Sequence, residues 1–191
     1  MTNAYIVGCG PNGHLGYAKM KRDNLIILCN ASIKVAEDYR VGRFSKGFDN
    51  IMWMISDGNI PKLPWFYTYY EKYKHILWGG DQIIEKVKCA HSFKENPWFA
   101  WNDLRLVEGS YRGGGSIVGC AMQHCLYNDL IPTLVGVDMC GPESISHPGK
   151  ETYKPDHWEF KKHVLNHLIK THLPETTTLT ETALDVKKVW S

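Results

Sequence analysis

Short runs of apolar, often β-branched residues recur along the chain and alternate with longer stretches of helical character. The runs with strand character cover 5–7, 25–28, 51–55 and 132–137, and Gly, Asn or Asp follows each of them closely. Continuous apolar runs are typical of strands buried on both faces, and their alternation with helices indicates right-handed crossovers between parallel strands. The pattern predicts one α/β domain over residues 1–191, Rossmann-like, with a largely parallel sheet and helices on both faces.

Two helices and a closing segment complete this prediction. Residues 116–127 are apolar nearly all round, as expected of a helix packed between the sheet and its neighbours. Residues 155–172 form an amphipathic surface helix, with Pro155 in its first turn. A last strand is expected over 176–180, followed by a short helix or turn. The aromatic stretch 61–74 predicts a helix that contacts the core, with a lid near a ligand as the alternative.

Composition narrows the classes of function. The 191 residues carry 22 basic and 20 acidic side chains, a net charge of +2, so there is no strong nucleic-acid signal, whereas a small anionic ligand is easily accommodated. The N-terminus lacks the features of a signal peptide, and no stretch approaches the roughly 18 apolar residues of a membrane span. A cytoplasmic protein is therefore expected. The oligomeric state stays open, a homo-oligomer included.

The first predicted strand runs into a glycine-rich loop, Gly8-Cys9-Gly10-Pro11-Asn12-Gly13. Glycines let backbone N–H groups approach a ligand closely. A loop at this position in an α/β sheet is a common phosphate-binding site. An ordinary tight turn is the alternative. The loop matches neither the Walker pattern nor the dinucleotide fingerprint. Its predicted nucleotide contacts are Gly8, Gly10, Pro11 and Asn12.

Polar residues also follow the later strands. Asn30 and Asp57 come just after the second and third strands, where they are placed to bond a ribose or a base, and Asp138 follows the strand at 132–137. Helix capping is the alternative for Asn30 and Asp57. The sequence predicts that all three acceptors belong to one ligand site.

A second glycine-rich segment precedes the buried helix. Gly114, Gly115 and Ser116 combine bare backbone, a hydroxyl and the partial positive charge of a helix N-terminus, which makes this the best anion site in the chain. In the structural alternative, the glycines only permit close packing and Ser116 only caps the helix.

The order of these motifs resembles the bacterial sialyltransferases of the Campylobacter type (glycosyltransferase family 42) and the related 6-hydroxymethylpterin diphosphokinase-like family. The resemblance implies a nucleotide, a CMP-sugar in the transferases, bound across the strand ends through Asn12, Asn30 and Ser116. The chain departs from the family pattern at Asp57, where relatives have Asn, and after Asp138, where tyrosines are replaced.

The resemblance also implies a reaction. His147 matches the position of the catalytic histidine, with His157 as a second candidate, and would deprotonate an acceptor hydroxyl of a small molecule or glycan. Backbone amides around Gly10 and Gly114, together with Ser116, would stabilise the departing phosphate without a metal or other cofactor. A glycosyltransferase is the expected activity.

Two alternatives stay open. One is a pyrophosphokinase acting on a pterin- or nucleoside-like alcohol, with Mg²⁺ held by Asp57 and Asp138. The other is a nucleotide-binding protein without turnover, which the small size of the chain favours.

Overall fold

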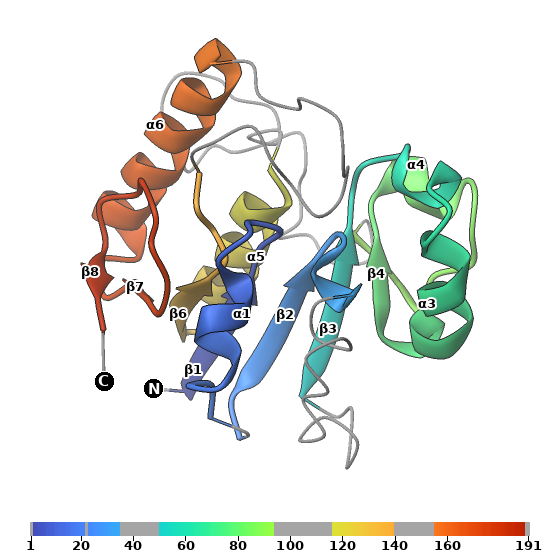
Figure 1. Ribbon diagram of the computed structural model, residues 1–191, viewed down its shortest axis with the longest axis horizontal. Helices are drawn as coiled ribbons and strands as arrows, with labels where there is room; N and C mark the ends of the chain where they lie inside the picture. The colour runs from blue at the N-terminus through green and yellow to red at the C-terminus, as the bar shows by residue number, and fades with distance from the viewer. Residues whose placement is uncertain (1, 22, 35–49, 94–115, 140–154, 190–191) are drawn as a thin grey trace.

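The computed structural model describes residues 2–21, 23–34, 50–93, 116–139 and 155–189. Within these residues the chain forms one eight-stranded sheet in the order β5-β4-β3-β2-β1-β6-β7-β8, and all its neighbouring strands are parallel (Figure 1). The strands are β1 (Thr2–Val7), β2 (Leu25–Cys29), β3 (Ile51–Ile55), β4 (Leu77–Gly79), β5 (His91–Ser92), β6 (Leu130–Val135), β7 (Thr177–Thr178) and β8 (Lys187–Lys188). The predicted parallel α/β fold is confirmed.

The four predicted apolar runs supply the centre of the sheet. Ile6 of β1 lies opposite Ile27 of β2 on one side and Leu134 of β6 on the other, and all three side chains are buried. The strand expected to reach residue 137 ends at Val135 instead. Gly136 has φ +62°, a left-handed conformation that turns the chain out of the sheet.

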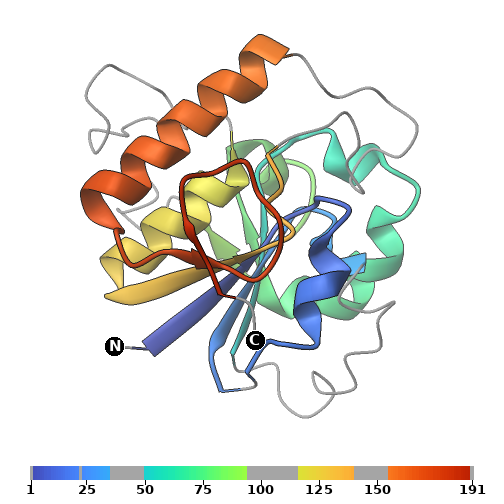
Figure 2. The same ribbon diagram turned by 60° about the vertical axis from the view of Figure 1, so that its left-hand side comes forward.

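Helices cover both faces of the sheet, as Figures 1 and 2 show. The α-helices are α1 (Gly13–Tyr17), α3 (Phe66–Tyr73), α4 (Asp81–Ile84), α5 (Ile117–Tyr127) and α6 (Pro155–His172), and the 3-10 helices are η1 (Ile60–Lys62) and η2 (Lys74–Ile76). One core cluster joins α5 and α6 to the sheet, and the other joins α1, α3 and α4 to the opposite face. The sheet is therefore the middle of three layers.

The aromatic segment belongs to the core. Phe66 is fully buried, stacks on Tyr70 with a centroid separation of 5.3 Å and lies 5.9 Å from the ring of Trp53 on β3. The expected core contact of this segment is confirmed. The predicted strand over 176–180 is present as the two-residue β7, and 181–186, expected as a short helix or turn, contains bends.

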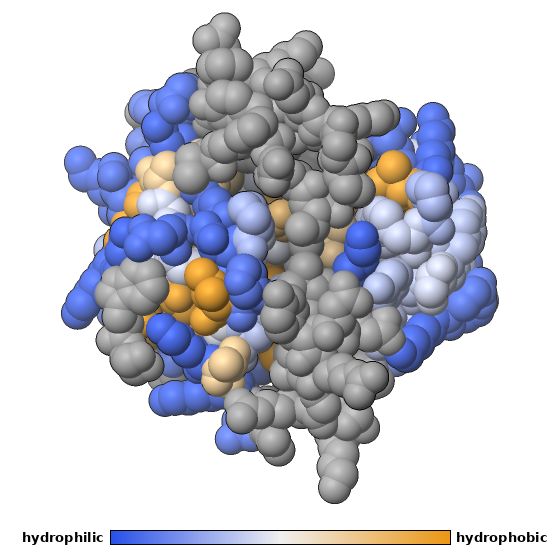
Figure 3. Space-filling view, in the orientation of Figure 1, coloured by the Kyte–Doolittle hydropathy of each residue, from blue (hydrophilic) through white to orange (hydrophobic). Residues whose placement is uncertain are grey.

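Helix α6 has the predicted amphipathic pattern. Leu165, Leu168 and Ile169 are buried against the sheet, whereas Lys162 pairs with Glu159 on the outer side. On the face of the molecule seen in Figure 1, the described surface is mostly hydrophilic, with small hydrophobic areas (Figure 3). Within the ranges described, no helix combines the length and apolar character needed to cross a bilayer.

Candidate functional site

The chain order of the sheet reverses at β1. Strands β2 to β5 extend from β1 in one direction, and β6 to β8 extend in the other. Helix α1, which follows β1, packs on one face of the sheet, and α6, which follows β6, packs on the opposite face. In open parallel sheets, ligands bind at the carboxyl ends of the strands at such a switch point. The carboxyl ends of β1 and β6 are therefore the candidate location of a ligand site.

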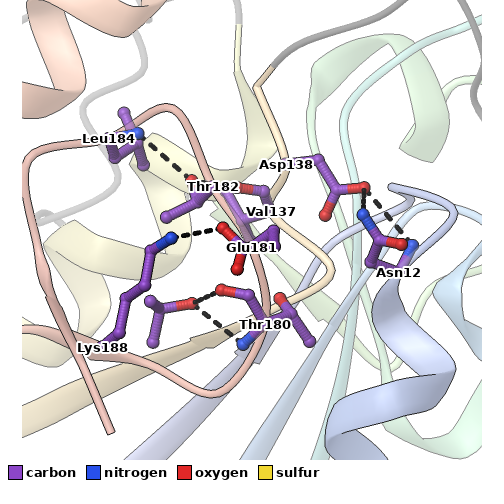
Figure 4. Close-up of polar contacts among 9 residues, drawn as sticks. Asn12, Val137, Asp138, Thr180, Glu181, Thr182, Leu184 and Lys188 are labelled. Carbon is purple, nitrogen blue, oxygen red and sulfur yellow. Dashed lines mark hydrogen bonds and ion pairs between the residues drawn. The ribbon is translucent and has the colours of Figure 1, made fainter. Parts of the chain in front are cut away.

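A hydrogen-bonded pair spans this switch point. The backbone N–H and the side-chain Nδ2 of Asn12 both donate to Oδ2 of Asp138, at 3.3 and 3.1 Å (Figure 4). Asp138 is only 4% exposed, and its Oδ1 has no hydrogen-bond partner in the part of the chain that the structure describes. Leaving a buried acceptor unpaired costs about 1–3 kcal/mol, so an atom of this kind calls for a partner from outside the fold.

Opposing effects act on the acidity of Asp138. Burial raises the pKa of this carboxyl above its ordinary value, while the two hydrogen bonds from Asn12 and the charge of His14 lower it. The net direction is upward. Burial therefore destabilises the ionised carboxylate by more than Asn12 and His14 stabilise it.

This balance predicts a pH-dependent effect of Asp138→Asn. A carboxyl whose pKa is raised by folding contributes stability that is fully present below its unfolded pKa and is lost as the pH rises through its folded pKa. Asparagine does not titrate, so Asp138→Asn should raise the melting temperature by a few degrees at about pH 7, and the gain should shrink towards about pH 4. Thermal melts of both proteins across this range measure the difference.

Asp129→Asn is the matched control for that experiment. Asp129 is exposed and precedes β6 at the opposite end of the strand, and its φ of 52° is one that asparagine tolerates. Because Asp129 is exposed, its replacement relieves no desolvation cost, so the gain expected for Asp138→Asn should be absent. A gain for Asp138→Asn that is equal at both ends of the pH range would contradict the assignment of a raised pKa.

The hydrogen bonds of the glycine-rich loop differ from those expected of a phosphate-binding loop. The amides of Gly8 and Gly10 donate to Val135 O and Gly136 O, both at 2.8 Å, and the amide of Gly13 donates to Gly10 O at 3.2 Å. These N–H groups bond within the fold. The expectation that these amides point at a ligand is therefore wrong, because those of Gly8 and Gly10 bind the end of β6 and the turn after it, and that of Gly13 bonds within the loop.

The glycines of this loop make room for that turn. A Cβ on Gly10 would lie 2.4 Å from Cγ of Asp138, and a Cβ on Gly8 would lie 2.4 Å from Gly136 O. Pro11 is exposed, and its carbonyl oxygen lies 2.8 Å from Nδ1 of His14. The small size of Gly8 and Gly10 therefore lets Asp138 and the turn before it lie against this loop, and nucleotide contact by Gly8, Gly10 and Pro11 stays a prediction.

Asn30 lies at the carboxyl end of β2, next to β1. It adopts φ 52°. Its backbone oxygen accepts a hydrogen bond from Nε1 of Trp53 at 2.7 Å, and its backbone N–H donates to the backbone oxygen of Met54 at 2.8 Å. These contacts to β3 hold the turn in place. The buried Oδ1 of Asn30 has no hydrogen-bond partner within the described ranges.

Asp57, at the end of β3, has a local role and an electrostatic one. Its Oδ1 accepts the backbone N–H of Asn59 at 2.9 Å, which closes a turn before η1. Asn59 is the N-cap of η1, so the helix-capping alternative for Asp57 is wrong. Asp57 also interacts with Lys161 of α6: burial lowers the pKa of Lys161, and the charge of Asp57 partly offsets this effect. The side chain of Lys161 is half-buried.

Ser116 precedes the first turn of α5. Its backbone has the extended conformation of an N-cap residue, but its side chain makes no capping hydrogen bond. The structural alternative, in which the hydroxyl serves only as a cap, is therefore not realised. Because α5 ends just before β6 begins, its N-terminus lies towards the carboxyl end of the sheet.

The segment after β7 braces the turn that carries Asp138. Oγ1 of Thr180 accepts the amide of Gly136 at 2.9 Å, Oγ1 of Thr182 donates to Val137 O at 2.5 Å, and the amide of Ala183 donates to Asp138 O at 2.9 Å. Figure 4 shows this segment alongside Asp138, together with the ion pair between Lys188 and Glu181. Sequence reasoning missed this role, for which the run of threonines was the only signal.

The strand order does not support Asp57 and Asp138 as ligands of one Mg²⁺. Neighbouring strands lie about 4.8 Å apart, so β3 and β6, three steps apart, are separated by about 14 Å. Magnesium needs oxygens at about 2.1 Å. Among the described residues, no group of three or more metal-ligating side chains gathers at this end of the sheet or elsewhere.

The predicted residues that can be located lie towards one end of the sheet. They are Gly8, Gly10, Pro11, Asn12, Asn30, Asp57, Ser116 and Asp138, whereas Gly114, Gly115, His147 and the side chain of His157 lie outside the described part of the structure. No family model, curated protein or solved structure matches the chain. The residues at this end of the sheet and the order of motifs along the sequence are therefore what indicates a function.

Proposed function

We propose that this protein binds a nucleotide-activated sugar of the CMP-sugar type at the carboxyl ends of β2, β1 and β6, and transfers the sugar to an acceptor hydroxyl. The observation that carries the proposal is the buried Asp138 carboxylate, held by Asn12 through one oxygen at the switch point while its other oxygen lacks a partner among the described residues. A ligand hydroxyl or amine would satisfy that oxygen.

The phosphate of the ligand needs groups other than the first loop, whose amides are engaged. The hydroxyl of Ser116 and the partial positive charge at the N-terminus of α5 are suited to it. Lys161 adds a positive charge on α6, close enough to Asp57 for their charges to interact. These groups support anion binding without a metal ion.

In the proposed reaction, the acceptor oxygen attacks the anomeric carbon of the donor sugar. The bond between that carbon and the phosphate oxygen breaks, and the nucleoside phosphate leaves with the electron pair. The acceptor proton passes to a general base, for which His147 is the candidate by resemblance. Ser116 and Lys161 would stabilise the charge that develops on the leaving phosphate.

The test is release of CMP from CMP-sialic acid, with and without glycan acceptors. We expect release that depends on the protein and increases with acceptor, and we expect Asp138→Ala to abolish it while Asp129→Asn retains it. Binding of the donor without any consumption would replace the transferase with a nucleotide-binding protein. Failure of every nucleotide and nucleotide sugar to bind would end the proposal.

A further inference from the structure

Two buried side-chain oxygens without partners lie at the carboxyl end of β2. Ser32 is 0% exposed, and its Oγ has no hydrogen-bond partner within the described residues. Oδ1 of Asn30, two residues earlier, is also buried without a hydrogen-bond partner among the described residues. Both atoms follow the strand that neighbours β1, so they lie next to the switch point.

The buried threonine hydroxyls of the same fold are paired. Oγ1 of Thr176 donates to Leu173 O at 2.7 Å, Oγ1 of Thr178 donates to Thr180 O at 2.9 Å, and Oγ1 of Thr180 accepts the amide of Gly136. Because the fold pairs these hydroxyls, the unpaired oxygens of Ser32 and Asn30 need an explanation of their own.

The chemistry of these atoms defines the ligand group that they suit. An amide oxygen only accepts hydrogen bonds, and a serine hydroxyl accepts as well as donates. Two acceptors so close in the chain match a pair of neighbouring hydroxyl donors. The end of the second strand, about 20 residues after the first glycine-rich turn, is also where α/β nucleotide-binding domains bond the ribose.

We propose that Asn30 and Ser32 bind the two ribose hydroxyls of the nucleotide, so that the site selects ribonucleotides over deoxyribonucleotides. This inference rests on the proposed nucleotide binding and specifies its orientation. Strands β2 and β6 lie on either side of β1, about 10 Å apart. One nucleotide can span this distance, with its ribose at the end of β2 and another of its hydrogen-bond donors at Asp138.

The experiment measures the affinity of the full chain for CMP, 2′-deoxy-CMP and 3′-deoxy-CMP by calorimetry. The wild type should bind CMP about tenfold tighter than either analogue, because each lost hydroxyl leaves a buried acceptor unpaired. In Ser32→Ala, affinity for CMP should fall about tenfold, and the preference for CMP over at least one analogue should disappear. The melting temperature of unliganded Ser32→Ala should stay unchanged or rise, because the hydroxyl of Ser32 has no hydrogen-bond partner among the described residues.

Thr176→Val is the matched control. Thr176 is as deeply buried as Ser32, but its hydroxyl is bonded, and it lies between α6 and β7, away from the strand ends of the site. This variant should lose thermal stability and keep both nucleotide preferences. If Ser32→Ala keeps both preferences, the ribose assignment is overturned while nucleotide binding stands. If the wild type binds none of the three nucleotides, the proposed function fails as well.

Discussion

Replacement of Gly136 by alanine will lower the free energy of unfolding by about 2–4 kcal/mol. The residue has φ +62°, and a Cβ there would lie 2.6 Å from Cα and 3.0 Å from N of Gly13. These are backbone atoms, so no side-chain rotation relieves the overlap. Because domains of this kind are stable by about 5–15 kcal/mol in total, the loss is a large fraction of it. Urea unfolding monitored by circular dichroism measures the change.

Gly119→Ala provides the comparison for this experiment. Gly119 lies within α5, and among the described residues a Cβ there would meet only Cδ2 of Leu165 at 3.6 Å, an ordinary contact. Alanine is favoured over glycine in helices, so this variant should be as stable as the wild type or more stable by up to about 1 kcal/mol. A Gly136→Ala protein as stable as Gly119→Ala would show that the turn after β6 is not packed against the first loop.

Asp138→Ala should weaken nucleotide binding about 100-fold, because a hydrogen bond to a charged group contributes about 1.5–3 kcal/mol and the loop also loses the acceptor that orders Asn12. Calorimetric titration with CMP measures the loss. Circular dichroism should show a retained fold, since removal of a buried carboxylate also removes its desolvation cost. Asp129→Asn, at the opposite end of β6, is the control and should bind CMP as the wild type does. A folded Asp138→Ala protein that binds CMP with full affinity would exclude Asp138 from the site.

The central strands and β7 could be predicted from the sequence, whereas β4, β5 and β8 could not. Strands β1, β2, β3 and β6 are apolar because both faces of each are covered by helices, and this burial leaves a clear pattern. Strand β8 is Lys187–Lys188, two exposed residues that form a strand only by pairing with β7. Strands β4 and β5 are similarly short, with three and two residues, and give no periodic signal.

The end of the sheet that holds the candidate site was predictable, but the hydrogen-bond partners of its residues were not. Parallel strands bring all their carboxyl ends together, so polar residues after successive strands had to lie at one end of the sheet. The bonds between Asn12 and Asp138 join residues 126 positions apart, and local sequence does not encode such a contact. Sequence reasoning therefore assigned the loop amides to a phosphate, whereas the amides of Gly8 and Gly10 donate to Val135 O and Gly136 O.

Lys161 illustrates a signal that was present but not used. It lies one helical turn before Leu165, on the stripe of α6 that packs against the sheet. A lysine at such a position either extends its charged end to solvent or meets an acidic partner, and here Asp57 lies close enough to interact. Helical spacing alone could not identify which strand end supplies that partner.

Amide hydrogen exchange with and without CMP shows directly whether a nucleotide binds at this end of the sheet. Binding should slow exchange in segments 8–13, 28–33 and 136–139, which follow or close β1, β2 and β6, and should leave segment 127–131 at the opposite end of β6 unchanged. Saturating CMP that slows exchange in none of the first three segments, or only in segment 127–131, would contradict a nucleotide site at the β1–β6 switch point.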